Sequence, residues 1–194
     1  MSVVIAAKYK NGVAMIADKQ VSRGTTRKDG ATKIHSFKYS NSGIGVVGYL
    51  RDCNVMRTLD EVISLEDILN KTPINELYVI KNVIPKIINH MRENKRVDTT
   101  GDVYSMGSEM LYVNKDGIYC IGGDFAVVEM EDFAAIGCGD DKASGYMTSI
   151  KMSAFGDTSK MSRQEIEVVL TNAIRQACEK DIYINDKTDI MFFE

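Results

Sequence analysis

The stretch SVVIAAKYKNGVAMIAD, residues 2–18, is the part of the sequence that decides the fold. Two apolar runs flank Lys10-Asn11-Gly12, a combination typical of a tight turn, and together they predict an antiparallel hairpin. Because both runs are apolar at nearly every position, we expect the chain to begin inside a sheet. Apart from Lys8, charged and small polar residues stand at the turn and at the two ends, where Ser2 precedes the first run and Asp18 ends the second.

Further strands are expected on both sides of a helical middle region. Short apolar runs bounded by turn residues predict strands at 32–39, 43–50, 108–123, 125–139 and 181–194, with the segment 108–123 repeating the hairpin pattern. Apolar residues at three- and four-residue steps predict helices instead at 51–70, 74–94, 142–154 and 163–178.

Two of these helices carry additional signals. In 74–94, Pro85 is expected to kink or break the helix, and in 163–178 Ser162 and Glu165 form the pattern of a capping box. The residues expected to face the core in 74–94 are Leu77, Ile80, Ile84, Ile87, Ile88 and Met91. In 51–70 they are Val55, Leu59 and Val62.

The order of elements is strands, two helices, strands, two helices and a strand. Two sheets that are apolar on both faces, each covered by a helix pair, predict a four-layer αββα sandwich of the α+β class. With 194 residues and no visible linker or repeat, we interpret residues 1–194 as a single domain.

The composition excludes several functional classes. A net charge of -3 with both signs interspersed gives no basic face for nucleic acid. No apolar run reaches the roughly 18 to 20 residues of a membrane span, and the first residues do not resemble a secretory signal, so we expect a cytoplasmic protein. The four cysteines lack CxxC spacing and the two histidines lack partners, so neither a metal site nor a histidine triad is predicted.

Ser2 offers another route to catalysis. Methionine is removed when the next side chain is small, and an N-terminal serine then carries its own base, because its α-amine has a pKa of about 8 and can take the hydroxyl proton through a water. Such a site needs a cation, for which Lys33 is the candidate, held by Asp18. The backbone N–H of Gly48 could stabilise an oxyanion. Each of these residues also has a purely structural interpretation.

Several motifs together resemble the proteasome β-subunit family, including its bacterial HslV-type branch. They are VVIAAKYKNGVAMIADKQVSRGT, GATKIHSF, GIGVVGYLRD, AAIGCGDDKASGYM and DIYIND, which cover most of the chain. The resemblance implies that Ser2 occupies the position of the N-terminal nucleophile, Asp18 and Lys33 those of the catalytic acid and lysine, and Gly48 that of the oxyanion glycine. It also places Cys138 where the family has a supporting serine, and Asp181 at the supporting aspartate.

The resemblance has implications for substrates and partners as well. Ser22 and Gly48 are expected to bind an extended peptide, and an apolar pocket is expected from Val21, Ala31, Val46 and Leu50. Stacked rings of six or seven subunits would enclose the sites, unfolded polypeptides would be the substrates, and an ATP-dependent unfoldase ring would be a partner. Catalysis would need no metal or cofactor. The single residue before Ser2 resembles the HslV-type branch more than most proteasome β subunits.

Two alternatives stay open at this point. One is a catalytically inactive ring-forming subunit of the same fold, which Cys138 and a retained Met1 would favour. The other is a small-molecule amidase on the same scaffold, because a fold does not determine its substrate.

Overall fold

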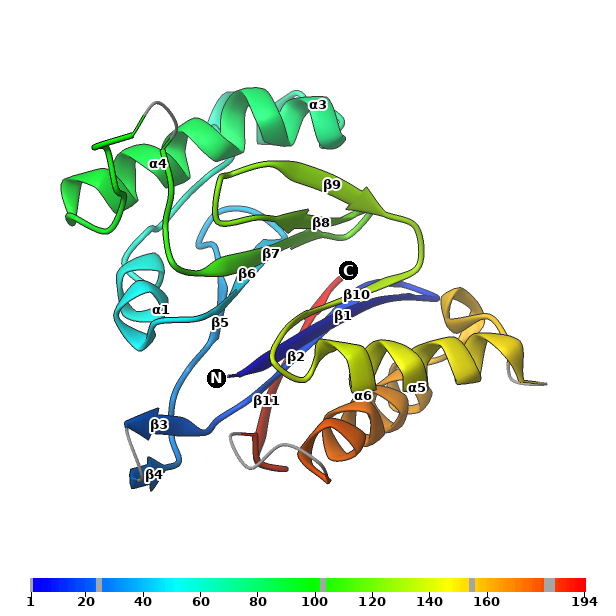
Figure 1. Cartoon of the computed structure of the whole chain (residues 1–194). Helices are drawn as coiled ribbons and strands as arrows, with labels where there is room; N and C mark the ends of the chain where they lie inside the picture. The colour runs from blue at the N-terminus through cyan, green and yellow to red at the C-terminus, as the bar shows by residue number, and fades with distance from the viewer. Residues whose placement is uncertain (1, 24–25, 102–103, 154–155, 180–183) are drawn as a thin grey trace.

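A computed structural model describes residues 2–23, 26–101, 104–153, 156–179 and 184–194. Two antiparallel sheets lie face to face, and helices cover the outer face of each, which gives four layers (Figure 1). The predicted αββα sandwich is therefore confirmed.

The first sheet is built around the predicted hairpin. Its strands run in the order β10-β1-β2-β11 and are all antiparallel; they are β1 (Val3–Tyr9), β2 (Gly12–Asp18), β10 (Phe133–Gly137) and β11 (Thr188–Phe193). At the turn Gly12 has φ +152°, and a Cβ there would lie 2.0 Å from the Phe193 carbonyl oxygen. The turn therefore requires glycine, because the end of the neighbouring strand β11 lies too close for a side chain.

The alternation of side chains in β1 explains why the hairpin is apolar on both faces. Val3 and Ile5 pack toward the helices below the sheet, whereas Val4 and Ala6 pack into the space between the two sheets. Because successive strand residues point to opposite faces, a strand buried on both sides must be apolar throughout. The hairpin is the centre of the first sheet for that reason.

The second sheet has the order β5-β6-β7-β8-β9, and a two-stranded hairpin forms a third, separate sheet. Its strands are β5 (Ile34–Ser36), β6 (Ser42–Val47), β7 (Glu109–Asn114), β8 (Ile118–Ile121) and β9 (Val127–Met130). The strand expected at 32–39 is thus only three residues long, and it pairs with β6. The small hairpin, β3 (Val21–Arg23) and β4 (Thr26–Lys28), was not predicted.

The helices form the two outer layers, as Figure 1 shows. Over the second sheet lie α1 (Leu50–Met56), α2 (Leu65–Leu69), α3 (Glu76–Tyr78), the π-helix η1 (Val79–Val83) and α4 (Ile84–Glu93). Over the first lie α5 (Asp140–Met152), the 3₁₀ turn η2 (Thr158–Lys160) and α6 (Arg163–Cys178). None of the helices in the described ranges is long and apolar enough to cross a membrane.

The single helix expected over 51–70 is wrong. The helix ends at Met56, and a second one begins only at Leu65. Val62 is buried in the core as predicted, but it reaches the core from an irregular segment, where the Asp60 carbonyl accepts a hydrogen bond from the Lys38 backbone at 2.9 Å. Packing against the 36–38 segment therefore overrides the local helical spacing.

The face of the helix at 74–94 is partly wrong. Ile84, Ile87 and Met91 are buried as expected, but Leu77 is 57% and Ile80 45% exposed. Immediately before Pro85 the helix widens into η1, where each turn holds an extra residue. This shifts the spacing, so that Tyr78, Val79 and Val83 face the core in the first half of the helix.

The predicted α6 is confirmed in its bounds and its cap. Ser162 accepts a hydrogen bond from the Glu165 backbone, and the Glu165 side chain returns one to the Ser162 backbone. Ile166, Leu170 and Ala173 are fully buried against the first sheet. The local sequence determines this helix completely.

Candidate active site

Asp18 anchors the beginning of the chain. Its carboxylate is fully buried at the end of β2 and accepts a hydrogen bond from the Val3 backbone at 2.9 Å and one from the Gln20 backbone at 3.0 Å. A buried charge is tolerated only when it is paired and hydrogen-bonded. Asp18 therefore fixes the residue that follows Ser2.

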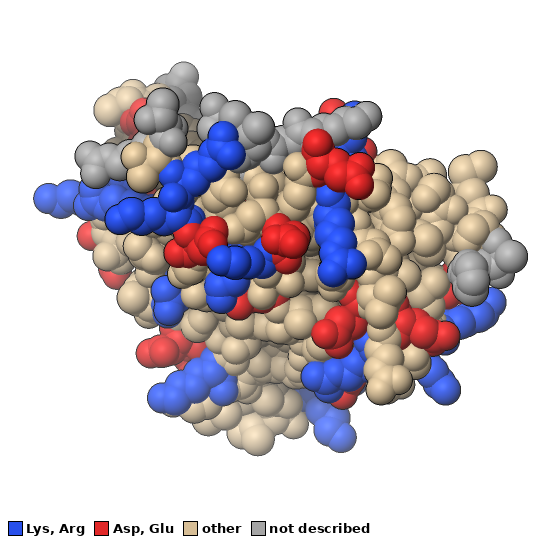
Figure 2. Space-filling model, turned by 90° about the horizontal axis from the view of Figure 1, so that it is seen from below, with Lys and Arg blue, Asp and Glu red and all other residues tan. Residues whose placement is uncertain are grey.

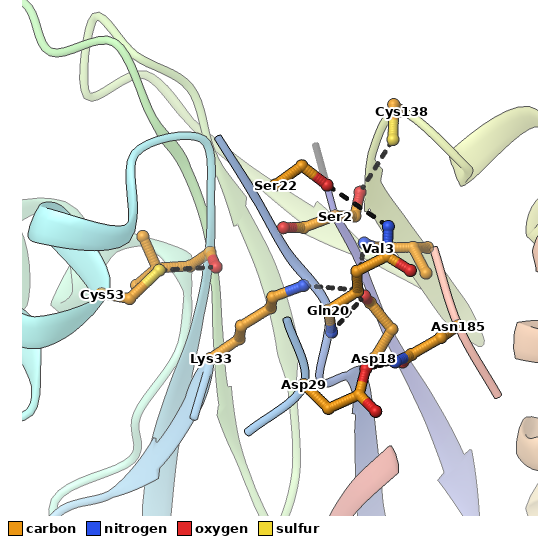
Figure 3. Close-up of polar contacts among 11 residues, drawn as sticks. Ser2, Val3, Asp18, Gln20, Ser22, Asp29, Lys33, Cys53, Cys138 and Asn185 are labelled. Carbon is orange, nitrogen blue, oxygen red and sulfur yellow. Dashed lines mark hydrogen bonds and ion pairs between the residues drawn. The ribbon is translucent and has the colours of Figure 1, made fainter. Parts of the chain in front are cut away.

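Lys33 supplies the charge partner. Its Nζ donates to Asp18 Oδ1 at 2.7 Å, and only 4% of the residue is exposed (Figure 3). Lys33 lies just before β5, and its backbone carbonyl accepts a hydrogen bond from the Val46 N–H at 2.9 Å. The predicted proximity of Lys33 to Asp18 is seen, although β5 belongs to the other sheet.

Burial and pairing act on this lysine in opposite directions. Burial lowers the pKa of Lys33 below its ordinary value, because the charged form loses water, and the charge and hydrogen bond of Asp18 oppose that effect without cancelling it. Lys33 is thus a buried ammonium that gives up its proton more readily than a surface lysine.

Ser2 is held from the opposite side by the turn after β10. Its carbonyl oxygen accepts hydrogen bonds from the Cys138 backbone at 3.0 Å and from the Cys138 thiol at 3.5 Å (Figure 3). Gly137 has φ +98°, and a Cβ there would lie 2.1 Å from the same carbonyl. Asp18 and the 137–138 turn together restrict Ser2, which is 7% exposed.

A small cavity of about 50 Å³ joins Ser2 to Lys33. Four of the predicted binding and oxyanion residues line it, namely Val21, Ser22, Gly48 and Leu50. Ala31 and Val46 do not line this cavity: both are buried, and Val46 packs under the helices of the outer layer. Asp181 lies outside the described residues.

Gln20 and Cys53 complete this cavity and were missed in the sequence. The Gln20 amide donates to the Ser22 hydroxyl at 3.3 Å, and the Cys53 thiol donates to the Val46 carbonyl at 3.3 Å. Burial raises the pKa of Cys53 to about 11, so it stays a neutral thiol near pH 7. No local motif marks either residue, since each acts only through its position in the fold.

A larger cleft of about 580 Å³ opens on the other side of Ser2. Its lining is Ser2, Val47, Gly48, Tyr49, Met106, Gly107, Ser108, Glu109, Gly123, Gly137, Cys138 and Asp140. Gly48 and Ser2 line both spaces. A polypeptide bound across them would therefore have its backbone close to the Ser2 side chain. No group of three metal-ligating side chains is found among the described residues.

Two antiparallel sheets packed face to face and covered on both outer faces by helices form the fold of the N-terminal-nucleophile hydrolases. The sequence matches the family model for proteasome subunits over residues 2–192. The chain therefore belongs to the proteasome subunit family.

Solved structures support the same assignment of the fold. Thiobacillus denitrificans BPH in complex with epoxomicin superposes with a TM-score of 0.70 at 18% identity, covering 99% of each chain. The eukaryotic HslV from Trypanosoma brucei gives 0.65 at 18% identity, covering 97% of each. No curated protein sequence matches this chain.

Proposed function

We propose that this chain is a self-compartmentalising peptidase in which Ser2, freed of Met1, is the nucleophile. The observation that carries the proposal is the buried Lys33–Asp18 pair, which is held against the backbone of Val3, the residue next to Ser2. A buried lysine and carboxylate cost free energy to desolvate, so an exclusively structural role would be served as well by apolar residues. Their location at the chain start favours a catalytic role.

The reaction follows from these groups. The α-amine of Ser2 takes the hydroxyl proton through a water, and the oxygen attacks the peptide carbonyl. The negative charge that develops on that carbonyl oxygen is stabilised by the Gly48 backbone N–H. The amine then returns the proton to the leaving nitrogen, the C–N bond breaks, and a water hydrolyses the resulting ester to restore Ser2.

Lys33 acts through its charge. Its ammonium lines the same small cavity as Ser2 and favours the neutral amine and the ionised hydroxyl. Asp18 keeps that ammonium oriented and raises its pKa against the effect of burial. The pair therefore lowers the free energy of the attacking oxyanion without taking part in a bond.

Family membership implies self-assembly into rings, and we infer that the substrates are unfolded polypeptides delivered by an ATP-dependent unfoldase ring. The peptide would bind in an extended conformation at Ser22 and Gly48, which both line the small cavity. Epoxomicin, present in the Thiobacillus denitrificans BPH structure, is a suitable probe of the site.

Intact mass spectrometry tests the nucleophile. Protein from its native cell is weighed before and after treatment with a β-lactone or a peptide boronate. We expect the mass to lack Met1 and to increase by one adduct that peptide mapping locates on Ser2. A retained Met1 or an adduct elsewhere would reject Ser2 as the nucleophile.

Variants test the roles of the individual groups. Ser2→Ala and Lys33→Ala should abolish peptide cleavage without dissolving the assembly, whereas Ser2→Thr should retain it. Lys19→Ala is the matched control, because Lys19 forms a partly exposed lysine–aspartate pair with Asp189 at 2.7 Å and does not line the cavity beside Ser2. Unchanged turnover in Lys33→Ala refutes the mechanism.

A second candidate, a non-catalytic ring subunit, is favoured by one observation. Cys138 offers a thiol, a weaker donor than a hydroxyl, at the position where the family resemblance places a supporting serine. A wild-type protein that assembles but forms no adduct with any of the probes would favour this candidate.

A further inference from the structure

Three side chains outside the predicted site form a buried polar network. Asp52, in the first turn of α1, is fully buried; its Oδ2 accepts from the Ser108 hydroxyl at 2.6 Å, and its Oδ1 accepts from the Arg96 guanidinium. Ser108 stands immediately before β7 and is 3% exposed. Neither the sequence patterns nor the family resemblance predicts a role for any of these three residues.

The network ends on the turn that carries Gly48. The Tyr49 backbone N–H donates to the Ser108 hydroxyl oxygen at 3.0 Å. The Tyr49 carbonyl accepts in turn from the Asp52 backbone at 2.9 Å. Asp52 therefore holds Tyr49 twice, directly through its backbone and indirectly through Ser108.

The direction of these hydrogen bonds is determined by the carboxylate. A hydroxyl has one proton, and next to a buried carboxylate, which can only accept, Ser108 must donate it to Asp52. Its lone pairs are then available to the Tyr49 N–H. Arg96 pairs with the same carboxylate and supplies its countercharge.

The Gly48–Tyr49 turn is closely packed against residues 107 and 108. Gly48 has φ +119°, and a Cβ there would lie 2.5 Å from the Ser108 hydroxyl oxygen and 2.7 Å from the Gly107 carbonyl. The Tyr49 ring covers Gly107, where a Cβ would lie 2.4 Å from the ring. The 106–108 segment thus restricts the conformation of Gly48, which lines both cavities beside Ser2.

We propose that Ser108 and Asp52 are positioning residues that hold the Gly48–Tyr49 turn, so that the Gly48 amide meets the oxyanion formed when Ser2 attacks. The inference rests on the proposed peptidase function. Because the Tyr49 amide is bound to Ser108, Gly48 is the donor that this turn offers to the substrate. Preorganised donors act on the transition state more than on the bound peptide.

The kinetics of Ser108→Ala test this role. Loss of a whole oxyanion donor costs about 10²- to 10³-fold in kcat, so a displaced donor should cost about tenfold. We expect that loss in kcat with KM unchanged, and an equal loss of affinity for a peptide boronate, whose adduct is tetrahedral. A Ser108→Ala enzyme with the kcat and boronate affinity of the wild type overturns the inference.

Ser64→Ala is the matched control. Ser64 makes the same kinds of contact, donating to the Asp67 carboxylate and accepting from the Asp67 backbone at the start of α2, and it lines neither cavity beside Ser2. It should leave kcat unchanged. Hydrogen exchange gives a readout independent of turnover: the Tyr49 amide should exchange faster in Ser108→Ala and at the wild-type rate in Ser64→Ala.

A second pair of variants covers the case in which Ser108→Ala does not assemble. Ser108→Thr keeps the hydroxyl, and Ser108→Val puts a methyl group in its place in a side chain of the same size. We expect the kcat of Ser108→Thr to be about tenfold higher than that of Ser108→Val. Equal kcat values overturn it. A wild type that neither cleaves peptides nor binds the boronate rejects the peptidase function itself, whereas an active wild type with unaffected variants rejects only the role of Ser108.

Discussion

Asp18 is the residue on which the candidate site depends. It ends β2, binds the Val3 and Gln20 backbones, and pairs with Lys33, so one carboxylate fixes both the chain start and the cation. The sequence predicts its place at the end of an apolar run. The pairing with Lys33, 15 residues away, was also predicted, and the folded chain shows it as a buried contact of 2.7 Å.

The pKa of Lys33 gives the first prediction. NMR titration of a labelled Lys33 Cε should show a midpoint below the ordinary lysine value of about 10.4, and Asp18→Asn should lower it further, because the charge of Asp18 raises this pKa. The folded chain holds this proton less tightly than the unfolded chain. Below the lowered pKa, the charged Lys33 therefore reduces the free energy of unfolding. This reduction is relieved as pH rises from the lowered pKa toward the ordinary value. A midpoint at or above 10.4 contradicts the prediction.

Gly137 gives the second prediction. Gly137→Ala should destabilise the fold by about 1–3 kcal/mol, because the new Cβ would clash with the Ser2 carbonyl and φ is positive. Gly145→Ala in α5 is the control, since nothing lies within 4 Å of its added Cβ, and it should stabilise by about 0.5–1 kcal/mol. Urea unfolding of both variants measures the difference, and equal effects would be inconsistent with a tight turn.

Among the elements, α6 and the helix at 74–94 differ in how far local sequence determines them. The stripe and capping box of α6 are complete within the helix, so both its ends and its buried face are predicted. At 74–94 the apolar spacing is equally regular, but η1 adds a residue to the turn before Pro85. A periodicity count assumes a constant number of residues per turn and cannot detect this change.

The cap of α6 gives the third prediction. Ser162→Ala should reduce the free energy of unfolding by about 1 kcal/mol, because the Glu165 amide loses its acceptor. Ser149→Ala, at an exposed position inside α5, should have no effect or a slightly stabilising one, since alanine is the better helix former. Thermal unfolding of the two variants checks this, and a Ser162→Ala protein as stable as the wild type would argue against the cap.

For the whole molecule, the arrangement of surface charge and apolar residues bears on assembly. On the face in Figure 2, basic and acidic side chains are intermixed. Lys187 and Asp29 form one of the ion pairs between exposed side chains. Some large apolar side chains are exposed, with Leu69 73% and Met152 84% exposed. We take these two as candidate subunit contacts, because burying an apolar side chain against a neighbouring subunit is favourable.

Ring formation gives the fourth prediction. Native mass spectrometry should detect complexes of about twelve or fourteen chains of 21.6 kDa, as expected from two stacked rings of six or seven. Leu69→Lys and Met152→Lys should each leave the subunit folded, and at least one should shift the mass toward smaller species. A wild-type protein that stays monomeric at micromolar concentration would contradict this.

The amino-acid sequence by itself determined the central hairpin, the four-layer order and the capped α6, because alternation, helical spacing and capping are local patterns. It also singled out Ser2 and Asp18 as polar residues at the ends of apolar strands. It also predicted that Lys33 is held by Asp18, and the structure shows that pair. Only the tertiary structure decided that Gln20 and Cys53 line the cavity and that Ser108 holds the Tyr49 amide 59 residues away. These contacts join different layers and loops, and packing between layers has no signature in the spacing of residues along one chain segment.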